Sequence, residues 1–204
     1  MRLRRMIKRQ SKWACYGLLL VIVAGCSQEV VRQEPLKPTK PQVVLAEKDK
    51  QAYRKALSHI KAKRYKKATG ILDGLLKKYP DAAGVLANRG IIFVKRKDLD
   101  KAEEYFVKAI KINDKLVQVR NHLAVLYRLK GKFTQARDML DAAIATDPYY
   151  ANAYYNLGIL YELYLQQPEK ALENYQLYLD LKKGGDKQVS QWVSLLQRQL
   201  KAGK

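Results

Sequence analysis

Side chains that could do chemistry are scarce in this chain, which has two histidines and two cysteines among 204 residues. His59 and His122 stand far apart, without the HExxH spacing or the close cysteine pair that marks a metal site. No strand pattern is followed by a glycine-rich loop of the kind that holds phosphate. The sequence therefore predicts no enzymatic activity, no metal site and no cofactor.

Cys26 is the residue whose neighbours indicate a covalent reaction. It follows the small residues Ala24 and Gly25, which suit the groove of a peptidase, and Val23 precedes them. This segment resembles the lipobox of bacterial lipoproteins, in which diacylglycerol is attached to the cysteine sulfur and the chain is cut ahead of the cysteine. The resemblance implies that Cys26 is lipidated, with fatty acyl chains such as palmitate. An ordinary signal peptide beside a chance cysteine is the alternative.

The residues ahead of Cys26 have the pattern of an export signal. Residues 1–12 are rich in Lys and Arg without an acid, and residues 13–25 are almost wholly apolar. That apolar run is shorter than the ~20 residues of a membrane-spanning helix. We therefore expect a lipoprotein signal peptide over residues 1–25. Ser27 follows the cysteine, and in enterobacterial lipoproteins, which this segment resembles, a serine at that position favours sorting to the outer membrane. We therefore expect a lipid anchor on the periplasmic side of the outer membrane, with the inner membrane as the alternative.

A fixed period organises the chain beyond this region. Alanines at equivalent places recur at Ala68, Ala102, Ala136 and Ala171, with spacings of 34, 34 and 35 residues. Such a period is typical of a solenoid of short helical repeats. Residues 26–48, by contrast, contain three prolines and no helical period, and we expect a disordered tether there.

The stretch 117–150 shows what one repeat contains. Small residues at Ala124 and Ala136 alternate with large ones at Tyr127 and Leu140, which suits two helices that cross closely. Gly131 permits the turn between them. The second helix is expected to be capped by a threonine and stopped by a proline, and these are Thr134 and Pro148.

This pattern of small and large positions resembles the tetratricopeptide repeat. The resemblance implies an all-α fold, a superhelical α-α solenoid of about four helix pairs over residues 49–186. The expected pairs are 49–82, 83–116, 117–150 and 151–186. An irregular helical bundle is the alternative.

Residues 187–204 read as one more amphipathic helix, with apolar residues that include Val189, Trp192 and Leu196. A solenoid leaves the apolar face of its last repeat open, so we expect this helix to cap it, with Asp186 at its start. Docking of Trp192 on a partner or a membrane is the alternative.

The resemblance also implies a concave groove, lined by the first helix of each pair, that binds a protein or peptide. Some members of the family clamp a C-terminal carboxylate there, but of the equivalent positions here only Asn88 matches. The residues expected in the partner-binding groove are Asn88, Ile91, Lys95, Asn121, His122, Val125, Arg128, Asn152, Tyr155, Asn156 and Ile159.

The net charge is +21, and the first repeat carries much of the excess. Ten basic and three acidic residues in 49–82 leave that repeat at net +7. A solvated charged face and a surface for anionic lipid or acidic cell-wall polymer are both compatible with this pattern. Nucleic acid is not expected, because an exported lipoprotein meets little of it. In addition, the single aromatic residue in the cluster is Tyr65, which the repeat needs for packing. The basic patch comprises Lys61, Lys63, Arg64, Lys66 and Lys67.

Together these features predict a lipid-anchored periplasmic scaffold or adaptor that binds a protein of an envelope machine. Similar lipoproteins with tetratricopeptide repeats serve pilus assembly of the type IV or Tad kind, where one kind guides the secretin, or lie beside TonB/ExbB-type complexes. Two alternatives remain: an adaptor or regulator of peptidoglycan hydrolases, and a structural lipoprotein whose basic first repeat binds anionic surfaces.

Overall fold

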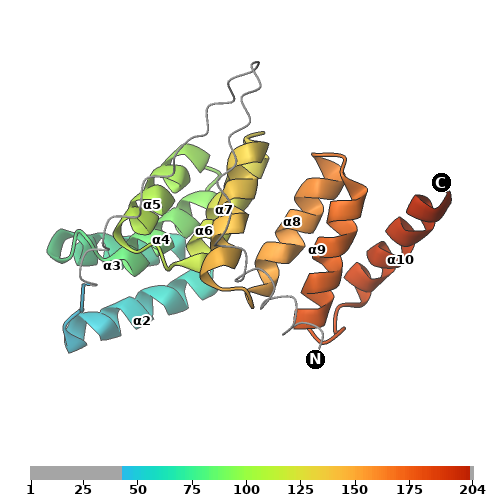
Figure 1. Cartoon of the computed structure of the whole chain (residues 1–204). Coiled ribbons are helices and arrows are strands. Elements are labelled where there is room, and N and C mark those ends of the chain that lie inside the picture. Colours follow the sequence, from blue (N-terminus) through green and yellow to red (C-terminus); the bar gives the residue numbers. More distant parts are fainter. Residues whose placement is uncertain (1–42, 203–204) are drawn as a thin grey trace, which may run out of the picture. The chain divides into compact units, whose positions relative to one another are not determined.

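The computed structural model describes residues 43–202, where all regular structure is helical (Figure 1). The signal peptide, Cys26 and residues 26–42 of the expected tether lie outside the described residues. Each helix has 13 to 16 residues, and short turns join them. The helices are α2 (Glu47–Lys61), α3 (Tyr65–Lys78), α4 (Ala83–Lys95), α5 (Leu99–Ile112), α6 (Val117–Leu129), α7 (Phe133–Thr146), α8 (Ala151–Leu163), α9 (Pro168–Leu181) and α10 (Lys187–Ala202).

The helices form four antiparallel pairs, α2–α3, α4–α5, α6–α7 and α8–α9, followed by α10. The second helix of each pair contacts the first helix of the next pair. The first helices also contact one another in the order α2, α4, α6, α8, whereas α10 contacts α9. This stacking is the α-α solenoid expected from the 34-residue period, and it places the first helices along one face.

Small residues allow the two helices of a pair to approach closely. Ala124, Ala136 and Ala143 in the third pair are almost fully buried, together with Leu140. In the second pair, Gly90 lies against the ring of Phe106, and a Cβ added there would come within 2.6 Å of that ring. The alternation of small and large positions is therefore confirmed as the packing rule of the pairs.

The turn between the helices of a pair uses one residue with positive φ. Gly131 has φ +72°, and the equivalent residues Lys63 and Lys97 have φ +57° and +61°. The predicted role of Gly131 is confirmed. The predicted cap at Thr134 is wrong, because α7 begins at Phe133 and its N-cap is Lys132, with no side-chain hydrogen bond.

The folded unit begins earlier than the repeat boundary expected at residue 49. Val43 and Leu45 pack against the apolar cluster of the first pair, and α2 starts at Glu47. Asp49 accepts hydrogen bonds from Lys78 Nζ at 2.9 Å and from the Tyr79 hydroxyl at 2.8 Å. These bonds lower the pKa of the Asp49 carboxyl, so it stays ionised at neutral pH.

The last helix covers the open end of the solenoid, as expected. Val189, Val193 and Leu196 of α10 are buried in one cluster with Tyr175 and Tyr178 of α9. Asp186 lies just before α10, and its Oδ1 accepts a hydrogen bond from the backbone N–H of Val189 at 3.1 Å. Asp186 is therefore the N-cap that the sequence predicted.

Candidate peptide-binding groove

Hydrogen bonds between consecutive first helices build the candidate groove. The Asn88 amide in α4 donates to the Tyr53 hydroxyl in α2 at 2.7 Å, and to the Gly84 carbonyl oxygen. Two junctions further on, the Asn156 amide in α8 donates to Asn121 Oδ1 in α6 at 2.8 Å. The two bonds occupy equivalent places at their junctions, and so they fix the spacing of the groove wall.

The middle junction, between α4 and α6, lacks this bond. Its equivalent residues are Ala87 and His122, and an alanine methyl group cannot accept a hydrogen bond. His122 instead stacks on Phe106, with ring centroids 5.8 Å apart and planes at 14°. The ladder of inter-repeat bonds is thus interrupted at its centre.

A small pocket of about 90 Å³ lies at this interruption. Four of the predicted groove residues, Ile91, Lys95, His122 and Val125, come together around it. Sequence reasoning did not predict the apolar residues that complete the wall. These are Val94, Leu99, Phe106, Leu126 and Leu129, and Leu129 remains 59% exposed.

The charged side chain in the lining of this pocket is Lys95. Lys95 is exposed and forms no ion pair with any described residue. Partial desolvation of the imidazole and the charge of Lys95 lower the pKa of His122, so the ring is neutral near pH 7. An apolar hollow beside a free ammonium group suits an apolar side chain with a carboxylate close to it.

The other predicted groove residues mostly hold the solenoid together. Asn121 is only 8% exposed. The Arg128 guanidinium donates to the Tyr164 hydroxyl at 2.9 Å. Tyr155 packs against Tyr178 and Trp192, at ring-centroid distances of 5.2 and 6.2 Å, and Ile159 contacts the same cluster.

Two asparagines complete the predicted set. Asn152 is exposed, and its carbonyl oxygen accepts a bond from Asn156 at 2.9 Å. Asn88 is the one residue that matches the carboxylate clamp, but its amide group already donates to Tyr53 and Gly84. A clamp of that kind would therefore have to break the bond to Tyr53 or the bond to Gly84.

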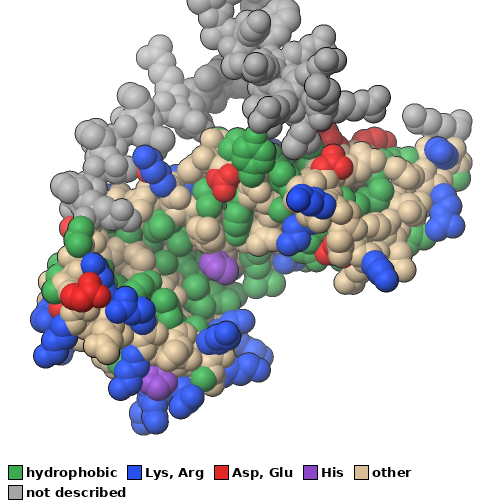
Figure 2. Space-filling view, turned by 90° about the horizontal axis from the view of Figure 1, so that it is seen from below, with side chains coloured by type: hydrophobic (Ala, Val, Ile, Leu, Met, Phe, Trp, Pro, Cys, Tyr) green, Lys and Arg blue, Asp and Glu red, His purple; other side chains and the backbone are tan. Residues whose placement is uncertain are grey.

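The predicted basic patch lies at the turn between α2 and α3. Its five residues, defined above, are all exposed and form no ion pair with any residue of the described part of the chain. Figure 2 shows Lys and Arg side chains gathered at the end of the solenoid where these helices lie. Desolvation and the charges of Arg64, Lys67 and Lys55 lower the pKa of nearby His59.

Neither a metal centre nor a membrane span is found in residues 43–202. No group of three or more His, Cys, Asp or Glu side chains there is arranged to hold a metal ion. Within the same residues, no helix has the length and apolar character needed to cross a bilayer.

Comparison with protein families identifies the repeats. A model described as "TPR repeat" matches residues 126–163, and two models described as "Tetratricopeptide repeat" match residues 83–116 and 52–82. The matched segments reach into all four helix pairs. No curated protein matches the chain in sequence.

Solved structures share the fold at low sequence identity. The structure of pilF from Pseudomonas aeruginosa is 19% identical with a TM-score of 0.70, and the match covers 76% of this chain and 70% of that chain. MamA from Desulfovibrio magneticus RS-1 is 20% identical with a TM-score of 0.65, over 78% and 88% of the two chains. The first TPR domain of Spaghetti (RPAP3), bound to the HSP90 peptide SRMEEVD, is 23% identical with a TM-score of 0.54, over 58% and 92%.

Proposed function

We propose that this tetratricopeptide-repeat protein is a lipid-anchored periplasmic adaptor that holds a segment of an envelope protein in its concave groove. The observation that carries the proposal is the interruption between α4 and α6, where Ala87 and His122 replace a hydrogen-bonded pair and a pocket opens. A groove whose only task was to join repeats would keep the bond at every junction. The lipobox-like segment ending at Cys26 supplies the anchor.

The chemistry of the pocket specifies the bound segment. Ile91, Val125 and the exposed Leu129 offer an apolar seat for one side chain of the partner. Lys95 offers a charge to a neighbouring carboxylate. The bound segment therefore carries an apolar residue next to an acidic residue or to a C-terminus.

The envelope machine that we favour is one that assembles a pilus or a secretin. A TonB/ExbB-type complex is the other envelope machine that we consider. The resemblance to pilus-assembly lipoproteins and the fold shared with pilF both support this choice. The resemblance also extends to tetratricopeptide lipoproteins that serve as adaptors of peptidoglycan hydrolases, and a hydrolase captured by the groove would favour that function.

Crosslinking in intact cells, followed by pull-down of the tagged chain, tests the groove. Val125→Glu puts a carboxylate into the pocket, and we expect at least a tenfold loss of the captured partner. Val107→Glu is the matched control, because Val107 is an exposed valine of α5 outside the pocket. Capture by Val125→Glu at the level of the control would move the interface away from the groove.

The same cells test the anchor through a third variant, Cys26→Ala. Without the thiol no diacylglycerol can be attached, so the protein should leave the outer-membrane fraction. A wild-type distribution of Cys26→Ala would exclude the lipid anchor and leave the groove result unaffected.

A further inference from the structure

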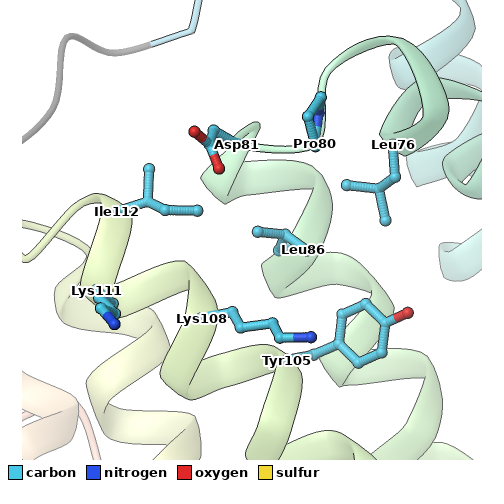
Figure 3. A pocket seen from close by; sticks show the side chains of 8 residues that line it. All are labelled: Leu76, Pro80, Asp81, Leu86, Tyr105, Lys108, Lys111 and Ile112. Carbon is cyan, nitrogen blue, oxygen red and sulfur yellow. The ribbon is translucent and has the colours of Figure 1, made fainter.

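A larger cleft lies where the second helices α3 and α5 face each other across the start of α4 (Figure 3). Its volume is about 550 Å³, within the usual range for ligand sites, and it shares no residue with the groove pocket. In Figure 3, the side chains of Leu76, Leu86 and Ile112 surround a common space, with Tyr105 beside them.

The cleft exists because one position of the repeat is occupied differently at this junction. The fourth residue of the first helix is Arg120 in α6 and Tyr154 in α8. The Arg120 Nε donates to the Asp114 carbonyl oxygen at 3.0 Å. The Tyr154 hydroxyl donates to the Pro148 carbonyl oxygen at 3.1 Å. A long side chain with a donor at its tip therefore fills this place at the two later junctions.

At the first junction the equivalent residue is Leu86, which is shorter and has no donor. The carbonyl equivalent to those of Asp114 and Pro148 belongs to Pro80, which lines the cleft. Among residues 43–202, no group donates a hydrogen bond to this oxygen. The junction thus retains both the space and the acceptor that a side chain of the chain itself uses elsewhere.

The rim of the cleft determines which partner group fits. Lys108 and Lys111 of α5 stand at its edge, and both are exposed. Lys108 forms an ion pair with Glu104 at 2.6 Å, whereas Lys111 forms none with a described residue. Asp81 also lines the cleft, so the two lysines leave its rim net positive. These cations would repel an incoming arginine but not a neutral tyrosine, and acidic residues beside the tyrosine would be attracted.

We propose that this cleft receives a tyrosine side chain from an acidic segment of a protein partner. The phenol ring packs between Leu76, Leu86 and Ile112, and its hydroxyl donates to the Pro80 carbonyl oxygen as Tyr154 does to that of Pro148. Carboxylates flanking the tyrosine meet Lys108 and Lys111. This is a second docking point, independent of the groove proposed above.

A set of synthetic peptides tests the chemistry on the purified full chain. The probe is a capped pentapeptide with a central tyrosine between two pairs of glutamates. When this peptide is titrated into the protein, the backbone amide NMR signals of Asp81, Leu86 and Ile112 should shift. Phenylalanine at the centre should weaken binding severalfold, and alanine or lysine flanks at least tenfold. Equal binding of the peptides with glutamate flanks and with alanine flanks would overturn the proposal.

Two substitutions test the location. Leu86→Tyr should fill the cleft from inside, abolish binding of the peptide, and leave the melting temperature unchanged or raised. Lys111→Glu, an exposed change that spares the core, should weaken binding at least tenfold, whereas Lys201→Glu on α10 should not. Unchanged peptide binding by Lys111→Glu, or by a folded Leu86→Tyr, would exclude the cleft as the binding site. If Leu86→Tyr does not fold, the binding measured for Lys111→Glu decides between the two results.

Discussion

Single residues show how closely the two helices of a pair are matched. Glycine stands opposite the aromatic rings, with Gly90 against Phe106 and Gly158 against Tyr175. The equivalent position in the third pair is Ala124, where the large residue at the ring's place is Leu140. The smaller residue on one helix thus compensates for the larger one on the other, and the helices keep their spacing.

Replacement of Gly90 by alanine tests this match. Alanine favours helix over glycine by about 1 kcal/mol. The new methyl group would lie 2.6 Å from the Phe106 ring, and overpacking of this kind costs about 1–3 kcal/mol. We expect the clash to dominate and Gly90→Ala to lower the free energy of unfolding, as measured by urea denaturation.

The matched control is Gly74→Ala in α3. No atom lies within 4 Å of a Cβ added there, so propensity acts alone and the variant should gain about 0.5–1 kcal/mol. Equal stabilisation of both variants would mean that Gly90 does not set the distance between α4 and α5.

At the scale of the element, α10 is the helix whose role is most easily isolated. It contacts α9 and buries only one face, with Val189, Val193 and Leu196 turned inward. Trp192 lies over Tyr155 and Tyr175, with ring centroids 6.2 and 5.8 Å away. This arrangement favours the capping role of Trp192 over docking on a partner or a membrane.

Two adjacent leucines of α10 give a direct measurement of that role. Leu196 is 3% exposed and Leu195 is 50% exposed. Leu196→Ala should cost about 2–5 kcal/mol through loss of buried surface and the cavity left behind. Leu195→Ala should change stability by less than about 0.5 kcal/mol. Similar melting temperatures for the two variants would indicate that α10 does not cover α9 in solution.

Helices and their pairing were predictable from the sequence because the repeat presents the same evidence several times. The alanines of the 34-residue period recur in every repeat, so one exception does not change the interpretation. The turn at Gly131 recurs only in conformation, because lysine occupies the equivalent positions 63 and 97. Helix starts were less predictable from the sequence. The N-cap of α7 is Lys132 and not Thr134, and the apolar pattern of the helix is equally compatible with either start.

The two candidate sites depend on departures from the repeat, and such departures are hard to interpret from sequence. Leu86 and Arg120 occupy the same position, but only the structure shows that Arg120 reaches the Asp114 carbonyl oxygen across a junction. Likewise, only the structure shows that Ala87 stands where a hydrogen-bond acceptor would pair with His122, which stacks on Phe106 instead. Periodicity predicts what is shared between repeats, whereas the sites lie where a repeat differs.

At the scale of the whole folded unit, charge divides the repeats. The first repeat, 49–82, carries net +7, whereas the fourth, 151–186, carries net −2. Asp49 and Asp73 of the first repeat are paired with Lys78 and Arg89, so they do not neutralise the basic patch at the turn between α2 and α3. The chain therefore presents a concentrated positive surface at the end that follows the expected lipid anchor.

We expect this end to bind anionic membranes independently of the lipid. Each exposed lysine near such a surface contributes about 1 kcal/mol at low salt, and screening shortens the interaction to about 10 Å at 0.1 M salt. The fragment of residues 43–202, which lacks Cys26, should sediment with vesicles rich in phosphatidylglycerol and be released as salt rises. The triple variant Lys63→Glu, Lys66→Glu, Lys67→Glu should bind at least a hundredfold more weakly.

The control variant makes the same change in charge at exposed lysines of the other end, Lys182→Glu, Lys187→Glu and Lys201→Glu. If attraction depended on net charge alone, both triple variants would lose binding equally. Loss confined to the first variant would locate the contact at the turn between α2 and α3, because screening prevents lysines at the far end from acting on the same membrane. Binding that survives both changes would rule out an electrostatic role for the first repeat.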